Sequence, residues 1–115
     1  MADRMIITMA EAKALEETIG AALLEADKAM RKFPQPNYVI SKVAEESGEV
    51  VKAAIHCAEG REAREAVLAE VVQCMAMLIR LCLEGDQVHG LPPLFAVEDR
   101  GPGCAFRDQM PGVAG

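Results

Sequence analysis

The sequence predicts an all-α fold, in which three main helices assemble into a multi-chain helical bundle and an irregular C-terminal arm follows. Composition is the first indication, because Ala, Leu, Met, Glu and Lys dominate and these residue types favour helices. Periodicity is the second, since apolar residues recur at spacings of three and four. The third is an aromatic content of only 3%, which indicates a core of aliphatic side chains and methionine.

The first helix is expected from Met9 to Arg31. Thr8 followed by Glu11 has the pattern of a capping box at its start. One apolar stripe follows this helix, with the members Leu15, Ile19, Leu23, Ala26 and Met30. The segment FPQPN, residues 33–37, ends the helix because two prolines are not accommodated in a helix interior.

The second and third helices are expected to pair with each other. The second should start at residue 36 or 37 and end near residue 59, and the third should span residues 62–84. Gly60 and Gly85 directly follow them, as is typical of helix C-termini. Because the link between these helices is short, we expect an antiparallel hairpin. The third helix is apolar almost all round, so it should be buried on most faces.

The chain divides into a helical domain, residues 1–85, and an irregular arm, residues 86–115. From residue 85 onward, the last 31 residues contain six glycines and four prolines and show no periodicity. Apolar residues such as Leu91 and Phe95 give part of the arm a means to pack on its own chain or on a partner. One domain with a modest core is what this chain length allows.

Charge and targeting signals exclude several classes of protein. The net charge of −6 argues against a generic nucleic-acid binder, which needs a basic face. The N-terminus lacks the long apolar stretch of a signal peptide. Glu70, Gln73 and Arg80 interrupt the apolar run 67–83, which makes it a poor membrane span. We therefore expect a cytoplasmic protein with no nucleic-acid partner and no membrane partner.

The cysteines do not indicate a zinc site. None of Cys57, Cys74, Cys82 and Cys104 belongs to a CxxC pair, and only two histidines, His56 and His89, are available as further ligands. Buried thiols in a reducing cytosol are the favoured interpretation of cysteines within apolar helical segments.

The segment KVAEESGEVVKAA, residues 42–54, clusters like charges on the second helix. It holds three neighbouring glutamates, Glu45, Glu46 and Glu49. The opposite arc of this helix is apolar and should be buried, with the members Val39, Ile40, Val43, Val50, Val51, Ala54, Ile55 and Cys57. Three adjacent carboxylates repel one another, and Lys42 and Lys52 neutralise them only in part. A divalent cation such as Mg²⁺, which prefers oxygen ligands, would neutralise them better.

The third helix supplies a second polar stripe, formed by Glu70, Gln73, Arg80 and Glu84. A buried ionised glutamate costs several kcal/mol unless it is paired or bound to metal. The hairpin should let Glu70 and Gln73 face Glu46 and Glu49. The alternatives are a solvated acidic face, a structural Gln73 in a bundle seam, and an Arg80 that pairs with Glu84 or Glu70.

These residues resemble the motifs of the MazG-like all-α nucleoside triphosphate pyrophosphohydrolase superfamily, which also contains dimeric dUTPases and phosphoribosyl-ATP pyrophosphatase. The family pattern is EExxE, a spacer, and then ExxD. Residues 45–49 read EESGE, the spacer is twenty residues, and residues 70–73 read EVVQ. The resemblance covers roughly residues 38–84.

The resemblance implies a hydrolase that splits the α–β bond of a nucleoside triphosphate to give a nucleoside monophosphate and pyrophosphate. It implies Mg²⁺, or Mn²⁺ in its place, and a homodimer or homotetramer. Glu46, Glu49 and Glu70 match metal ligands, and Glu45 matches a further ligand or the group that orients the attacking water. Helix phase makes Lys42, Lys52 and Arg80 candidates for phosphate contact. Tyr38, near the start of the second helix, is a candidate to stack on the base.

Gln73 departs from the family, which has Asp at this position. A glutamine can offer a metal one neutral carbonyl oxygen but carries no charge. Activity with fewer metals is one outcome, and nucleotide binding without catalysis is another. A third is recruitment of a carboxylate from the arm, where Asp86, Asp99 and Asp108 are available.

Three other functions stay open at this stage. One is phosphoribosyl-ATP hydrolysis, and another is a catalytically weakened helical dimer that binds nucleotides or a protein partner. The last is a plain helical interaction module, for which no stabilisation by divalent metal is expected.

Overall fold

The computed structural model of the protein describes residues 4–95. These residues form three α-helices, α1 (Met9–Lys32), α2 (Val39–Ala58) and α3 (Arg64–Glu84), and contain no β-strand. The predicted all-α class is therefore confirmed for the described part of the chain, and the helix ends lie within three residues of their predicted positions.

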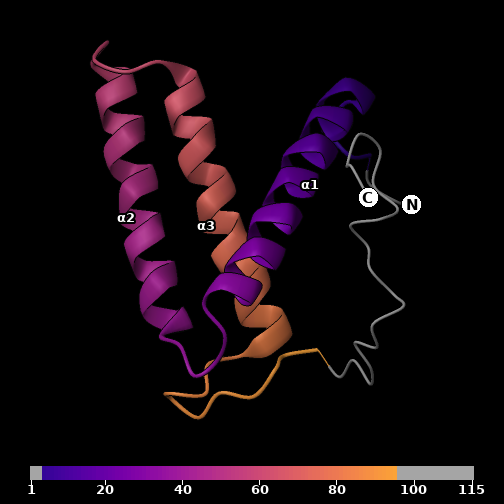
Figure 1. The fold of residues 1–115 in the computed structure, drawn as a ribbon. Helices are drawn as coiled ribbons and strands as arrows, with labels where there is room; N and C mark the ends of the chain where they lie inside the picture. The colour runs from indigo at the N-terminus through magenta and orange to yellow at the C-terminus, as the bar shows by residue number, and fades with distance from the viewer. Residues whose placement is uncertain (1–3, 96–115) are drawn as a thin grey trace.

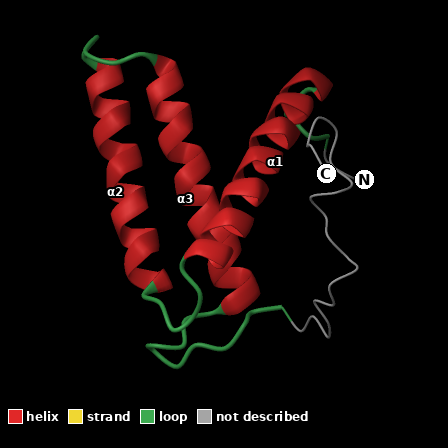
Figure 2. Cartoon of the chain, viewed as in Figure 1, coloured by secondary structure: helices red, strands yellow, loops and turns green. Residues whose placement is uncertain are grey.

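Helix α3 is the centre of the fold. Figure 1 shows α2 and α3 side by side, with a short loop, residues 59–63, joining their adjacent ends. Helix α1 packs on the C-terminal part of α3 and diverges from α2 toward its own N-terminus (Figure 2). The small core lies where the helices meet and comprises Ala26, Ala76 and Met77, with Ala29, Val43 and Ile79 packed against it. Within the described residues, the N-terminal end of α1 and the ends of α2 and α3 that the loop joins have no core in common.

The start of α1 follows the predicted capping box. The backbone N–H of Glu11 donates to Oγ1 of Thr8 at 3.1 Å, and the N–H of Thr8 donates to Oε1 of Glu11 at 2.9 Å. Two N–H groups that the helix itself cannot satisfy therefore find partners.

The end of α1 is fixed by a buried arginine of α3. Arg80 donates from Nε to Oε2 of Glu84 at 2.7 Å, and its two terminal nitrogens donate to the carbonyl oxygens of Ala29 and Phe33. Gln35 donates from Nε2 to the same oxygen of Glu84 at 3.0 Å. The last carbonyls of α1 are thus satisfied by a cation, which also suits the negative end of the helix dipole.

Helix α2 begins later than the sequence predicts, and a residue from another segment caps its N-terminus. Tyr38 precedes its first turn and makes no side-chain capping bond. Instead Oδ2 of Asp86, which follows α3, accepts a hydrogen bond from the N–H of Ile40 at 2.9 Å. The sequence around residue 37 gives no sign of a cap supplied from 46 residues away.

The buried face of α2 differs in part from the predicted apolar arc. Val39 and Ala53 are buried, but Ile40, Val51 and Ile55 are exposed. A narrower strip of α2 therefore contacts α3 than the sequence suggests, because one neighbouring helix covers only part of the arc.

The expectation that α3 is buried on most faces is wrong within a single chain. Only Ala76, Met77 and Arg80 are buried along it, while Leu68 and Leu78 are 50% and 45% exposed. By length and composition alone, α3 is apolar enough to cross a membrane, a criterion that core helices of soluble proteins also meet. Two helices of one chain are too few to cover it.

The first part of the predicted arm, residues 86–95, lies against the helices. Asp86 and Leu91 exchange two backbone hydrogen bonds of 2.8 and 2.9 Å, and the N–H of Leu94 donates to the carbonyl of Cys82. Gly85, with φ of 68°, makes the turn, and a Cβ there would overlap the backbone of Leu91 and Pro92. Residues 96–115, with Asp99, Cys104 and Asp108, lie outside the described residues.

Candidate acidic site on α2 and α3

The predicted acidic residues of α2 fall on one side of that helix. At about 100° per residue, Lys42, Glu45 and Glu49 lie within an arc of about 60°, and Glu46 lies beside them toward α3. Glu45 and Glu49 are exposed, whereas Glu46 is half-buried. Lys42 Nζ lies 3.5 Å from Oε2 of Glu45, an exposed pair that contributes little stability.

Glu46 is the residue of α2 whose carboxyl group interacts electrostatically with α3. Burial raises the pKa of Glu46 above its usual value of 4.5, and the negative charges of Glu70, Glu45 and Glu49 raise it further. Lys42 opposes this change. Glu70 belongs to α3, so the carboxylates of the two motifs are close enough to repel each other across the helix pair.

The two members of the predicted cluster that belong to α3, Glu70 and Gln73, lie about one helical turn apart. Glu70 and Gln73 are both half-buried, at positions that are neighbours on a helix surface. The repulsion between Glu70 and Glu46 places Glu70 toward α2, and that Gln73 faces α2 as well stays a prediction.

The described residues do not form a ready-made metal cage. Among residues 4–95, no three or more His, Cys, Asp or Glu side chains are placed to hold a metal ion. The donor chemistry nevertheless suits Mg²⁺, since carboxylate oxygens are the ligands it prefers. A cation at Glu46 and Glu70 would need side-chain rotations, or oxygens from a phosphate or a second chain.

Arg80 and Lys52, two of the residues predicted to contact phosphate, differ sharply in solvent exposure. Arg80 is 2% exposed and its guanidinium is already bonded to Glu84 and to the end of α1. This arrangement assigns Arg80 a structural role and leaves no free face for a phosphate, which corrects the sequence prediction. Lys52 is exposed on α2. The predicted pairing of Arg80 with Glu84 is confirmed.

A second polar group, not predicted from the sequence, lies at the N-terminal end of α2. Asp86 is completely buried and accepts three hydrogen bonds, from the N–H of Ile40 and from the N–H and ring Nδ1 of His89. Burial acts to raise the pKa of Asp86, but these bonds outweigh it and lower the pKa to about 2. In the sequence, Gly85 and Gly90 are the signal that could have indicated a tight loop around Asp86.

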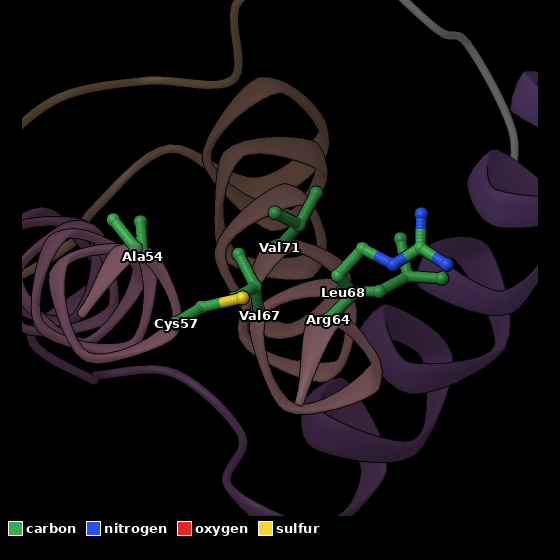
Figure 3. Close-up of a pocket in the computed structure, with 7 residues that line it drawn as sticks. Ala54, Cys57, Arg64, Val67, Leu68 and Val71 are labelled. Atoms are coloured by element: carbon green, nitrogen blue, oxygen red, sulfur yellow. The ribbon is translucent and has the colours of Figure 1, made fainter. Parts of the chain in front are cut away.

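An apolar groove lies at the other end of the α2–α3 pair. Its lining comprises Ala54, Cys57, Ala58, Arg64, Val67, Leu68 and Val71, with almost no polar surface. Figure 3 shows Ala54 and Cys57 of α2 beside Val67 and Val71 of α3. Because the groove is open and apolar, it is not a site for phosphate or metal.

Comparison of the chain with protein-family models, with curated proteins and with solved structures finds no match. The function of the acidic site is therefore inferred from its own residues.

Proposed function

We propose that the protein is a Mg²⁺-dependent nucleoside triphosphate pyrophosphohydrolase that acts as a homodimer or homotetramer. The reaction consumes one water, breaks the α–β phosphoanhydride bond, and releases a nucleoside monophosphate and pyrophosphate. The resemblance of EESGE and EVVQ to the family motifs supports this proposal, as does an antiparallel arrangement of α2 and α3.

The observation that carries the proposal is the electrostatic repulsion between the two acidic motifs. Glu70 of α3 raises the pKa of Glu46 of α2, together with burial and with the neighbouring Glu45 and Glu49. A half-buried cluster of like charges destabilises a protein unless something neutralises it. Retaining such a cluster on an otherwise apolar helix pair is a feature of functional sites.

The carboxylates divide two tasks between them in this proposal. Glu46, Glu49 and Glu70 would hold the cation, with the amide oxygen of Gln73 as a weaker ligand. Bound Mg²⁺ would neutralise the triphosphate and activate water. Glu45 orients the attacking water, and Lys42 and Lys52 balance the charge of the phosphates. Tyr38 offers an exposed aromatic ring at the end of the same helix.

Exposed apolar side chains support assembly with further copies of the chain. Leu15 and Ile19 of α1, Ile55 of α2 and Leu68 and Leu78 of α3 are all at least 43% exposed. The groove between α2 and α3 adds apolar surface of the same kind. Burial of such surface is the main source of free energy for association.

A nucleotide panel tests the proposal. The protein is incubated with each of the eight common NTPs and dNTPs and with phosphoribosyl-ATP, in Mg²⁺ or Mn²⁺, and pyrophosphate is measured. Release of pyrophosphate together with monophosphate is expected for at least one substrate. Glu70→Gln should reduce kcat at least about 100-fold, the upper end of what even indirect metal partners contribute. The exposed Glu17→Gln is the matched control. No pyrophosphate from any substrate would overturn the proposal.

Gln73 favours a second candidate, a helical dimer that binds nucleotides without cleaving them. The described residues lack a preformed metal group, and the family carboxylate at position 73 is missing. Gln73→Asp separates the two candidates. A large gain of activity from none supports the non-catalytic dimer, and a small change or a loss supports a working variant site.

A further inference from the structure

One exposed histidine at the N-terminal end of α2 is held unusually firmly. The side chain of His89 is 46% exposed, yet ring Nδ1 lies 3.1 Å from Oδ2 of Asp86. Its backbone N–H donates to Oδ1 of the same residue at 3.1 Å. Backbone bonds between Asp86 and Leu91 close the loop that carries it. An exposed side chain fixed by a buried partner is typical of a preorganised binding group.

The bond to Asp86 fixes which ring nitrogen of His89 is available. The carboxylate of Asp86, with a pKa lowered to about 2, is ionised at neutral pH and can only accept hydrogen bonds. Nδ1 of His89 must therefore carry the hydrogen in this contact. When the ring is neutral, Nε2 is then a hydrogen-bond acceptor, because the contact with the Asp86 side chain engages Nδ1 alone.

Tyr38 provides an aromatic surface next to the His89 ring. The centroids of the Tyr38 and His89 rings are 6.2 Å apart, with the ring planes at 73°. An edge-to-face pair leaves ring surface open for stacking, and Tyr38 is 59% exposed. An acceptor beside an open aromatic face is suited to a planar heterocycle that carries a donor.

The pair lies at one end of the acidic stripe of α2. Tyr38, Lys42, Glu45 and Glu49 recur at spacings of four, three and four, so they follow one side of the helix. The seven residues from Tyr38 to Glu45 correspond to about 10 Å along the helix axis. A nucleoside triphosphate whose phosphates lie at the glutamates can therefore extend its base toward this pair.

We infer that Tyr38 and His89 bind the base of the nucleotide, with Tyr38 stacked on it and Nε2 of His89 accepting a hydrogen bond from an exocyclic amino group. Adenine, cytosine and guanine carry such a group, whereas uracil and thymine do not, so nucleotides of the first kind are favoured. The inference rests on the proposed function in that it assigns the base end of the same nucleotide site. Asp86 is a positioning residue that orients His89.

Two substitutions of His89 separate base binding from a structural role. In His89→Asn the introduced side-chain amide reaches about as far as Nδ1 and can keep the Asp86 contact, but no atom replaces Nε2. His89→Gln places an amide where Nε2 stood. Val88→Ala, at an exposed position of the same loop, is the control.

Steady-state kinetics with ATP, CTP and UTP give the first readout. His89→Asn should raise KM for ATP and CTP about tenfold, as expected for one lost hydrogen bond, with little change for UTP or in kcat. His89→Gln should retain more of the affinity, and Val88→Ala should match the wild type. Inhibition by tripolyphosphate, which has no base, should be equal in all four proteins.

Equal KM changes for all three nucleotides, or better rescue by His89→Asn than by His89→Gln, would overturn the inference. NMR titration with AMP and CMP in the absence of metal gives a second readout, in which the ring signals of Tyr38 and His89 should shift. If these signals shift but no nucleotide is hydrolysed, the proposed hydrolase function is refuted and the inferred base site is supported. If nucleotides are hydrolysed and neither KM nor the ring signals respond, the base site alone fails.

Discussion

Glu46 combines a cost to folding with a proposed role in binding. Its pKa is raised by burial and by the charges of Glu70, Glu45 and Glu49. A raised pKa means that the folded state holds the proton more tightly than the unfolded state does. The stability that this provides is present below pH 4.5 and is lost as the pH rises through the raised pKa. At neutral pH the ionised side chain therefore weakens the metal-free fold.

Removing the charge of Glu46 should stabilise the protein in the absence of metal. In EDTA at pH 8, Glu46→Gln should melt at a higher temperature than the wild type, and the difference should shrink toward pH 4, where Glu46 is protonated. Thermal unfolding followed by circular dichroism across this pH range is the measurement. Glu17→Gln, on the exposed face of α1, should show no such pattern, and a lower Tm for Glu46→Gln at pH 8 would contradict the proposed strain at Glu46.

At the scale of elements, the helices follow from local sequence, but their connections do not. The capping box at Thr8, the prolines of residues 33–37 and the glycines after α2 and α3 act over a few residues, so they are readable in the chain. Asp86 caps α2 from across the fold, and Arg80 caps α1 from α3. Such long-range caps depend on packing, which the sequence pattern does not contain.

The same distinction applies to the acidic site. The EESGE and EVVQ motifs and their spacing are enough to predict that Glu46 and Glu70 approach each other, because the motifs lie on two helices joined by a short link. The assignment of Arg80 to phosphate failed because helix phase shows on which side a residue lies but not how deeply it is buried. The contact of His89 with Asp86 was not predicted because both residues belong to a segment that the sequence marks only as irregular.

Asp86 should make the link between α2 and the loop after α3 sensitive to acid. Its pKa is lowered from 3.8 to about 2, so its contribution to stability is present above pH 3.8 and is lost as the pH falls toward 2. Asp86→Asn should therefore lower the Tm at pH 7 and make unfolding between pH 4 and pH 2 less steep. Asp27→Asn is the control, because the partly exposed carboxylate of Asp27 pairs with Arg31 of the same helix. An unchanged acid transition in Asp86→Asn would contradict the role of Asp86 as a tertiary cap.

At the scale of the whole molecule, the single chain leaves too much apolar surface exposed for its small core. Leu68 of α3 is half exposed and lines the α2–α3 groove, so a lysine at this position should be tolerated in an isolated chain. Light scattering should give the wild type a mass of two or four times 12.4 kDa. Leu68→Lys should reduce that mass, while Glu62→Lys in the loop before α3 should not. A wild-type mass of one chain would contradict the proposed assembly.

The proposed function depends above all on Glu46 of α2 and Glu70 of α3 holding one cation between them. The most direct test is the shift in Tm caused by millimolar Mg²⁺, measured with and without a nonhydrolysable nucleotide, for the wild type, Glu46→Gln, Glu70→Gln and Glu17→Gln. Because a ligand that binds only the folded state must raise the Tm, we predict a clear rise for the wild type and Glu17→Gln. Little or no rise is predicted for the other two. An equal rise in all four proteins, or no rise in the wild type, would contradict a shared cation at these two glutamates.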